Sequence, residues 1–238
     1  MSLSSLRAKG WDMFKRYAIY YTPAPGSALA DFGAAWLGWD SATGRAVAHP
    51  DASGLDVAAI TGTPRKYGLH GTIKPPFRLA EGQTADALAA ELAALCADAA
   101  PVTLDGLTLA RLGKFLALVP DGDAAALAHL AARAVQELDH FRAPATDAEL
   151  AKRRAARLSP AQDALLVQWG YPYVLDEFRF HLTLSGRLEA DVAAAAEAAL
   201  TPMLAELSLR PYGITGLTLL GEDEDGMFHQ ITRYALTG

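Results

Sequence analysis

One stretch of this chain occurs twice, and each copy carries a histidine followed two residues later by a threonine. The first copy lies in residues 67–74 and the second in residues 178–185. Apolar residues alternate with polar ones in both, which predicts two β-strands, each with an apolar and a polar face. The polar faces together hold two imidazoles and two hydroxyls: His70, Thr72, His181 and Thr183.

The surroundings of the two copies also repeat. Gly-Leu-Thr-Leu begins at Gly106, 36 residues after the first histidine, and again at Gly216, 35 residues after the second. A segment with helical periodicity lies before each of these sequences. The chain therefore contains two copies of one supersecondary unit, at about residues 67–120 and 178–236. Two ordinary hydrogen-bonded histidines are the alternative interpretation, but the shared context favours a function.

Composition places the chain among globular proteins. Of its 238 residues, 51% are hydrophobic and 20% charged, and no apolar run is long enough for a bilayer. Residues 1–17 lack the apolar core of a signal peptide. The single cysteine, Cys96, lies in a predicted helix and is expected to be a buried core residue. These features favour a cytoplasmic location. The net charge of −6 argues against long nucleic acid as the partner and is compatible with a small anionic substrate.

The remaining segments predict an α+β protein. A strand is expected at residues 17–22, and Pro75 and Pro76 are expected to end the first histidine strand. Helices and hairpins complete both units, so we expect two pseudo-symmetric lobes of mostly antiparallel sheet with outer helices. Residues 142–173 form a helical insertion between the units of what we expect to be one bilobal domain, residues 1–238.

The insertion carries two helix-start signals and a cluster of cations. Thr146 with Glu149 forms a capping-box pattern, and Ser159 precedes a proline. The cluster is either a lid over an anionic substrate or a solvated helix face; it consists of Lys152, Arg153, Arg154 and Arg157. A second pair, Arg65 and Lys66, leads into the first histidine strand, where it either meets a phosphate or is solvated.

Two histidines on facing strands permit acid–base catalysis. Histidine changes charge near neutral pH, so one ring can accept a proton from a nucleophile while the other donates one to a leaving oxygen. Threonine hydroxyls on the same face can bind the oxygens of a phosphate. The alternative is a metal site, but no third histidine or acidic residue lies at a recognisable ligand spacing. We therefore expect neither metal nor cofactor.

The paired motifs, His70-Gly71-Thr72-Ile73 and His181-Leu182-Thr183-Leu184, resemble those of the two-histidine (2H) phosphoesterases, which include cyclic phosphodiesterases that act on RNA ends. Three longer segments resemble the branch of that superfamily encoded beside bacterial phosphonate-utilisation genes. These segments are residues 67–77, 169–173 and 178–183.

The resemblance implies a cleft between two lobes, with one His-x-Thr motif from each lobe facing it. His70 and His181 would be the acid and the base, in an unassigned order, and Thr72 and Thr183 the phosphate ligands. Further candidates for substrate binding are Lys74, Arg179 and Tyr67. The function expected is metal-independent opening of a small cyclic phosphate, such as a ribosyl cyclic phosphate. The alternatives are a cyclic phosphodiesterase or ligase for RNA ends, and a phosphometabolite-binding protein without turnover.

Overall fold

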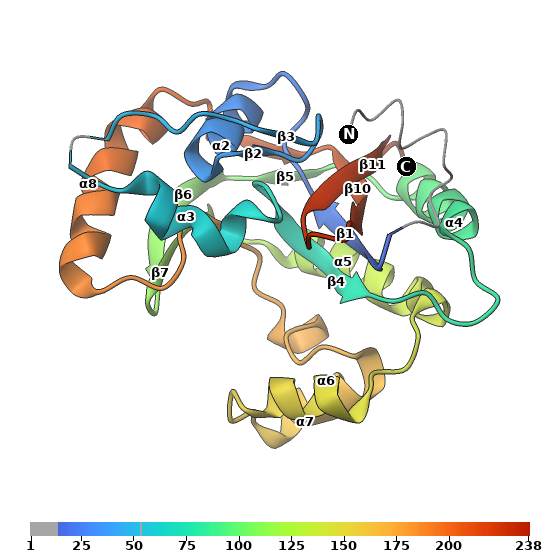
Figure 1. The fold of residues 1–238 in the computed structure, drawn as a ribbon. Coiled ribbons are helices and arrows are strands. Elements are labelled where there is room, and N and C mark those ends of the chain that lie inside the picture. The colour runs from blue at the N-terminus through green and yellow to red at the C-terminus, as the bar shows by residue number, and fades with distance from the viewer. Residues whose placement is uncertain (1–13, 53) are drawn as a thin grey trace.

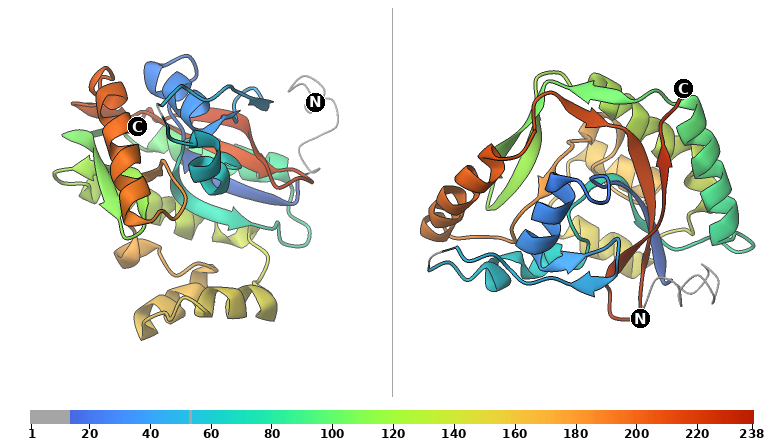
Figure 2. Two further views of the ribbon diagram at one scale, coloured as in Figure 1. Left: turned by 60° about the vertical axis from the view of Figure 1, so that its left-hand side comes forward. Right: turned by 90° about the horizontal axis from the view of Figure 1, so that it is seen from above.

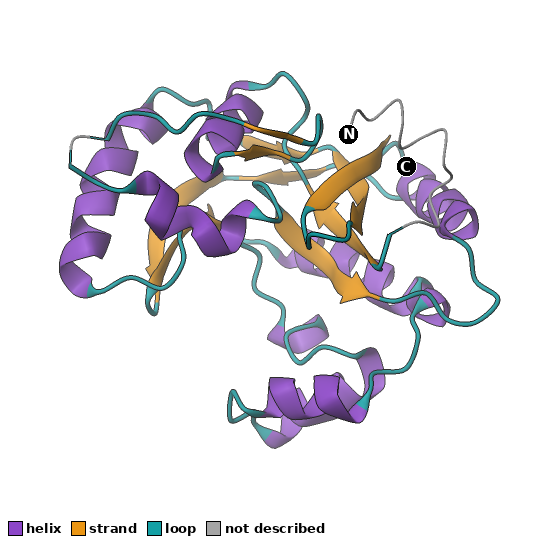
Figure 3. Ribbon diagram, in the orientation of Figure 1, coloured by secondary structure: helices purple, strands orange, loops and turns teal. Residues whose placement is uncertain are grey.

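The computed structural model of the chain describes residues 14–52 and 54–238. The expectation that residues 1–17 lack a signal-peptide core therefore falls almost wholly outside the described residues. Strands occupy the centre and helices the periphery (Figures 1 and 3). Within the described ranges, no helix has the length and apolar character needed to cross a membrane.

A seven-stranded sheet forms the centre of the molecule, and every neighbouring pair in it is antiparallel. The strand order is β11-β10-β1-β4-β8-β7-β6. The strands are β1 (Arg16–Tyr21), β4 (Gly71–Phe77), β6 (Gly106–Leu112), β7 (Phe115–Asp121), β8 (Leu182–Thr183), β10 (Gly216–Glu222) and β11 (Phe228–Ala235). Together with the outer helices, this sheet confirms the predicted α+β class.

The two repeats exchange their hairpins. β4 of the first repeat lies in one half of the sheet, with β1 and the β10–β11 hairpin of the second repeat. β8 of the second repeat lies in the other half, with the β6–β7 hairpin of the first. Two short strands, β5 (Val102–Leu104) and β9 (Tyr212–Ile214), pair where the hairpins cross. Each half of the sheet is therefore built from both repeats.

A local twofold relation connects the repeats. Gly71 of β4 pairs with Leu182 of β8, and each is the counterpart of the other in the His-x-Thr motif. Thr103 likewise pairs with Gly213 at the hairpin crossing. Pairing between counterparts is what a twofold axis through both contacts requires. The pair Gly71–Leu182 is also the register contact that joins the two halves of the sheet.

One helix of each repeat likewise packs on the hairpin of the other repeat. In the first repeat α4 (Ala85–Asp98) packs on β10 and β11, and in the second α8 (Ala190–Ala205) packs on β7. These two helices lie at opposite ends of the molecule (Figure 2). Helix α5 (Ala125–Glu137) covers β4. The remaining α-helices are α2 (Ala28–Leu37), α3 (Val57–Arg65), α6 (Asp147–Arg154) and α7 (Pro160–Trp169). Two single 3-10 turns are η2 (Asp139–Phe141) and η3 (Leu175–Glu177). A separate two-stranded sheet pairs β2 (Trp39–Asp40) with β3 (Arg45–Ala46).

Several helices begin directly after a residue whose side chain caps the first turn. Ser27 and Thr84 each accept a backbone N–H bond at the start of α2 and α4. Both insertion helices begin where predicted. The capping box predicted at Thr146 is present, and Ser159, predicted as a cap before proline, forms a full capping box with Gln162 as well. Cys96 lies fully buried in α4, as predicted, and this burial raises the pKa of its thiol to about 11.

The prediction that Pro75 and Pro76 end the strand was wrong. β4 continues through both prolines to Phe77, and its register against β1 shifts between Lys74 and Phe77. Such a bulge tolerates residues without an N–H group, and on its other side β4 pairs with β8 at Gly71, before the prolines.

Both histidine strands begin later than predicted, so that neither histidine lies within a strand. Residues 67–74 were expected to form the first, whereas β4 begins at Gly71. Residues 178–185 were expected to be extended throughout, whereas β8 contains Leu182 and Thr183 alone. Residues 178–181 follow the turn η3, and Leu184 donates its N–H to the carbonyl oxygen of Leu116 in β7.

Candidate active site

The register between β4 and β8 brings the two motifs together. Extending the antiparallel Gly71–Leu182 pair by one residue in each direction places each histidine opposite the threonine of the other motif. Thr72 and Thr183 lie within β4 and β8 and point to the opposite face of the sheet from that pair, while His70 and His181 immediately precede the two strands. Directly opposed Cβ atoms lie about 4.5–5.5 Å apart. The facing residues are His70 with Thr183, and Thr72 with His181.

The glycine in the first motif is required by close packing. A Cβ atom on Gly71 would lie 2.3 Å from Cε2 of Phe180, which is far inside van der Waals contact. The corresponding position in the second motif is Leu182, which is fully buried. The two motifs therefore differ at their middle residue because the Phe180 ring fills the space beside β4.

Both histidines are oriented by the same backbone contact. His70 Nδ1 lies 3.0 Å from the carbonyl oxygen of Gly68, and His181 Nδ1 lies 2.8 Å from that of Arg179. A carbonyl only accepts, so each Nδ1 carries the proton and donates it. In the neutral ring Nε2 is then the free base. Both imidazoles thus present Nε2 as the nitrogen available for proton transfer.

Aromatic rings surround the first imidazole. His70 stacks on Tyr20, with centroids 4.0 Å apart, and Tyr67 lies at 5.4 Å. Burial lowers the pKa of His70 to about 4; the bond to Gly68 opposes this shift, and the charge of His181 adds to it. Thr72 Oγ1 lies 3.3 Å from Nε2. His70 is therefore neutral at pH 7 and holds Nε2 beside a hydroxyl.

A cavity of about 240 Å³ opens beside these groups. Its walls come from both motifs, the first strand, the loop before β4 and the insertion. It is lined by Arg16, Tyr20, Thr63, Pro64, Tyr67, His70, Thr72, Pro75, Pro76, Arg153, Tyr171, Thr183 and Ser185. Four of the seven sequence candidates thus line one cavity: Tyr67, His70, Thr72 and Thr183. His181 is not among the lining residues, but it lies close enough for its charge to act on His70.

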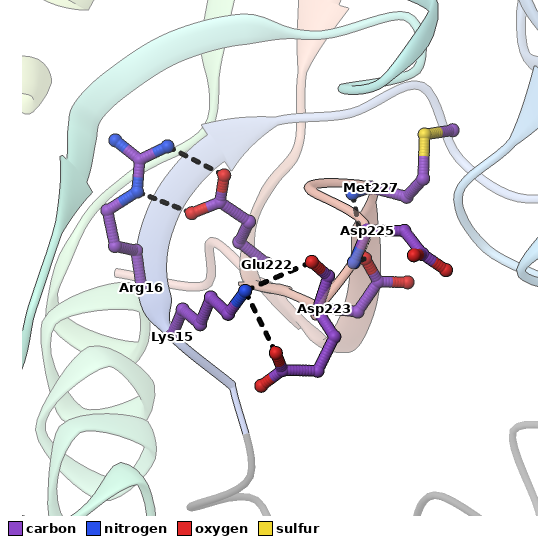
Figure 4. A network of polar contacts seen from close by, with 7 residues as sticks. Lys15, Arg16, Glu222, Asp223, Asp225 and Met227 are labelled. Atoms are coloured by element: carbon purple, nitrogen blue, oxygen red, sulfur yellow. Dashed lines mark hydrogen bonds and ion pairs between the residues drawn. The ribbon is translucent and has the colours of Figure 1, made fainter.

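Two arginines line the cavity that were not among the predicted site residues, although Arg153 belongs to the basic cluster that was predicted to be either a lid or a solvated helix face. Arg16 begins β1, and its Nε and Nη2 donate to the carboxylate of Glu222 (Figure 4). Arg153 of α6 lies over the Tyr171 ring, with Cζ 4.7 Å from the centroid. For Arg153, the basic cluster of the insertion was a usable signal. For Arg16 the sequence gives none, because its partner is distant in the chain.

The structure does not place Lys74 or Arg179 at the cavity. The Lys74 side chain is buried, and its Nζ lies 3.0 Å from both the carbonyl oxygen of Val135 and Oδ1 of Asp139. The Arg179 guanidinium donates to the carbonyl oxygens of Asp176 and Phe178 in its own loop. The predicted substrate role of these two residues therefore has no support from their positions. Tyr67, in contrast, lines the cavity.

Arg65 is also bound within the protein, since its Nε donates to the carbonyl oxygen of Leu37. Across residues 14–52 and 54–238, no three histidine, cysteine or acidic side chains gather in a way that could hold a metal ion.

Solved structures similar to this chain include a phosphoesterase and the E. coli LigT protein complexed with 3′-AMP. Each aligns with a TM-score of 0.43 and 14% sequence identity, over 94% of this chain and 99% of the other.

Two curated proteins also match, and both are named ribose 1,5-bisphosphate phosphokinase PhnN. The protein from Janthinobacterium sp. (strain Marseille) is 38% identical over 218 residues, which is 89% of this chain and 48% of the relative. The one from Laribacter hongkongensis (strain HLHK9) is 38% identical over 176 residues, 73% of this chain and 40% of the relative. The chain thus spans about half the length of the curated relatives it matches, or less.

A family model matches residues 72–229, which is well over half of the chain and includes both threonines and the second histidine of the paired motifs. Its description is "Protein of unknown function (DUF1045)". This chain belongs to the DUF1045 family.

Proposed function

We propose that this protein is a phosphodiesterase that opens a small cyclic phosphate without a metal ion. The observation that carries the proposal is the antiparallel pair Gly71–Leu182, which brings the two His-x-Thr motifs together beside a cavity lined by His70, Thr72 and Thr183. A phosphate between them would meet two groups able to transfer protons and two able to donate hydrogen bonds.

His70 is the general base in this proposal. Its lowered pKa keeps the ring neutral at pH 7, and the bond from Nδ1 to Gly68 leaves the lone pair on Nε2. Nε2 accepts a proton from water as the water oxygen forms a bond to phosphorus. The hydroxyl of Thr72, 3.3 Å from Nε2 in the free protein, then turns to a phosphate oxygen.

His181 is the general acid. Its Nδ1 is bound to the carbonyl of Arg179, so the protonated ring presents Nε2–H to the departing oxygen. The P–O bond of the ring breaks as this proton is transferred, and the products are a phosphate monoester and a free hydroxyl. Thr72 and Thr183 donate to the non-bridging oxygens, whose charge increases in the transition state.

A ribosyl cyclic phosphate is the substrate class we favour. The matched relatives are named for ribose 1,5-bisphosphate, which carries a phosphate on C1. Opening a cyclic phosphate between C1 and C2 of ribose yields a monoester of that kind. The kinase activity in the name is not proposed for this chain, because its sequence holds no Gly-x-x-x-x-Gly-Lys-Ser/Thr loop.

Turnover of a panel of cyclic phosphates in the presence of EDTA tests the proposal. The panel contains a ribose 1,2-cyclic phosphate and 2′,3′-cyclic nucleotides. We expect activity in EDTA, with kcat at least about 100-fold lower in His70→Ala and in His181→Ala, as for loss of acid–base catalysis. His129→Ala, an exposed histidine of α5, is the matched control and keeps wild-type activity.

Three results would contradict the proposal. If activity appears only after a metal ion is added, the metal-independent mechanism is wrong. If cyclic phosphates bind without turnover, the protein is a binding protein and not a phosphodiesterase. If only the 2′,3′-cyclic nucleotides turn over, the ribosyl cyclic phosphate is not the substrate and the protein acts on RNA ends.

A further inference from the structure

A second and larger cavity, of about 550 Å³, adjoins the first. The two share four lining residues: Arg16, Tyr67, Pro76 and Arg153. We call the larger one the basic cavity, because six of the residues that line it are cationic and one, Glu149, is acidic. The cations are Arg16, Lys66, Arg78, Arg142, Lys152 and Arg153.

This concentration of positive charge opposes the charge of the protein as a whole. The chain has a net charge of −6, yet the cations of the basic cavity come from separate segments: β1, the loop before β4, the end of β4, the start of the insertion and α6. Like charges gathered in one concave surface repel one another and attract an anion. Their convergence from segments distant in the sequence therefore indicates a binding site for an anionic group.

Three of the six cations are already held by carboxylates. Arg16 binds Glu222, Arg78 binds Glu149, and Arg142 binds Asp139 through both Nε and Nη2. These pairs fix the walls of the cavity.

The other three are available for a ligand. Lys66 and Arg153 lie over the rings of Tyr67 and Tyr171, and Lys152 is exposed on α6. In the part of the chain that the structure describes, no carboxylate lies within ion-pair distance of any of them.

The helix that supplies two of these cations has no role in the core. None of the residues of α6 is buried, and the helix lies below the sheet with α7 (Figure 1). It is positioned by its capping box at Thr146 and by the bond from Arg78 to Glu149. Leu150 is partly buried and the other residues of α6 are exposed, so the helix adds little to stability through apolar burial. Its contribution is the charge of Lys152 and Arg153 at the basic cavity.

We propose that the basic cavity binds a second phosphate of the substrate, one that does not react. The inference rests on the proposed function: the cyclic phosphate lies between the histidines, and a phosphate elsewhere on the same small molecule reaches Lys66, Lys152 and Arg153. Arg16 and Arg153 line both cavities and so lie between the two phosphates. The substrate class is therefore a cyclic phosphate with a distal phosphomonoester, such as a ribosyl 1,2-cyclic phosphate phosphorylated on C5.

Paired substrates test this inference. Turnover is measured for ribose 1,2-cyclic phosphate with and without a 5-phosphate, and for adenosine 2′,3′-cyclic phosphate with and without a 5′-phosphate. Charge-assisted hydrogen bonds to the added phosphate are expected to lower KM at least about 10-fold in at least one pair. In Lys66→Gln/Lys152→Gln this advantage disappears, while kcat/KM for the substrates without the added phosphate changes less than about 2-fold. Arg154→Gln, on the same helix but paired with Asp163, is the matched control and keeps the advantage.

The outcomes separate the two proposals. Turnover with no KM advantage in either pair overturns the second-phosphate site and leaves the phosphodiesterase in place. If no substrate turns over, calorimetry with ribose 5-phosphate is decisive. Binding that weakens at least about 10-fold in Lys66→Gln/Lys152→Gln supports the site although the proposed reaction has failed. Equal affinity of wild type and variant overturns it.

Discussion

His70 lies stacked on Tyr20, with ring centroids 4.0 Å apart and an angle of 24° between the planes. The contact removes water from one face of the imidazole, and burial lowers the pKa of His70 to about 4. A base with such a pKa stays neutral in mildly acidic solution. The burial to which this stacking contributes thus extends the pH range over which the proposed base can accept a proton.

The first prediction concerns the acid limb of the pH–rate profile. kcat/KM reports the ionisation of the free enzyme, so its fall on the acid side should have a midpoint near pH 4 instead of near 6.5. Tyr20→Ala, which uncovers the imidazole, should move this midpoint upward by about 1 unit or more. Initial rates at low substrate concentration between pH 4 and 7 measure both. A wild-type midpoint near 6.5 would exclude His70 as the base.

The second prediction concerns stability. The pKa of His70 is 6.5 when unfolded and about 4 when folded, so between these values the unfolded chain binds more protons. Stability should therefore fall as the pH drops from 6.5 to 4, and His70 adds no further loss below that. From pH 7 to 5 we expect a contribution of about 1 kcal/mol after allowing for solvent screening. Urea unfolding should show a smaller loss in His70→Phe than in wild type, with His129→Phe as control. Equal losses in all three proteins would be incompatible with a shifted His70.

The third prediction concerns the buried ion pair behind the site. Asp139→Ala leaves the Lys74 ammonium without its carboxylate, and burial already lowers the pKa of Lys74. We expect a loss of roughly 2–4 kcal/mol. Lys74→Met should cost less than about 1 kcal/mol, since Asp139 keeps both bonds from Arg142. Denaturant unfolding of both variants measures the difference; a larger loss in Lys74→Met would contradict this account.

The fourth prediction concerns the middle residue of the first motif. Gly71→Ala places a methyl group 2.3 Å from the Phe180 ring, so the variant should lose about 1–3 kcal/mol through overpacking. Phe180→Leu removes that ring, and in this background Gly71→Ala should cost less by at least about 0.5 kcal/mol. A double-mutant cycle by thermal unfolding measures the coupling. Additive effects would show that the methyl group is accommodated elsewhere.

The sequence contained most of the local structure. Helix starts at Ser27, Thr84, Thr146 and Ser159 were predictable because a side-chain cap and the residues after it act within one turn. Strand periodicity also predicted strand at Thr72 and Thr183, although each histidine lies just before its strand.

Which strands pair with one another was harder to predict from the sequence. Both hairpins begin with Gly-Leu-Thr-Leu, at Gly106 and Gly216, so nothing in their local sequence states which histidine strand each will join. Lys74 shows the same limit. Alternation placed it on the face of His70, but α5 and η2 cover that part of the strand and bind its ammonium. Which element covers which part of a face depends on contacts between residues distant in the chain.

The exchange of hairpins also has a consequence for how the protein is made. β4 needs β10 and β11 to complete its half of the sheet, although more than a hundred residues separate β4 from them. During translation β1 and β4 therefore cannot complete their half of the sheet until residues up to Ala235 have left the ribosome. A nascent chain that ends at the insertion would hold His70 and Thr72 on an incomplete sheet.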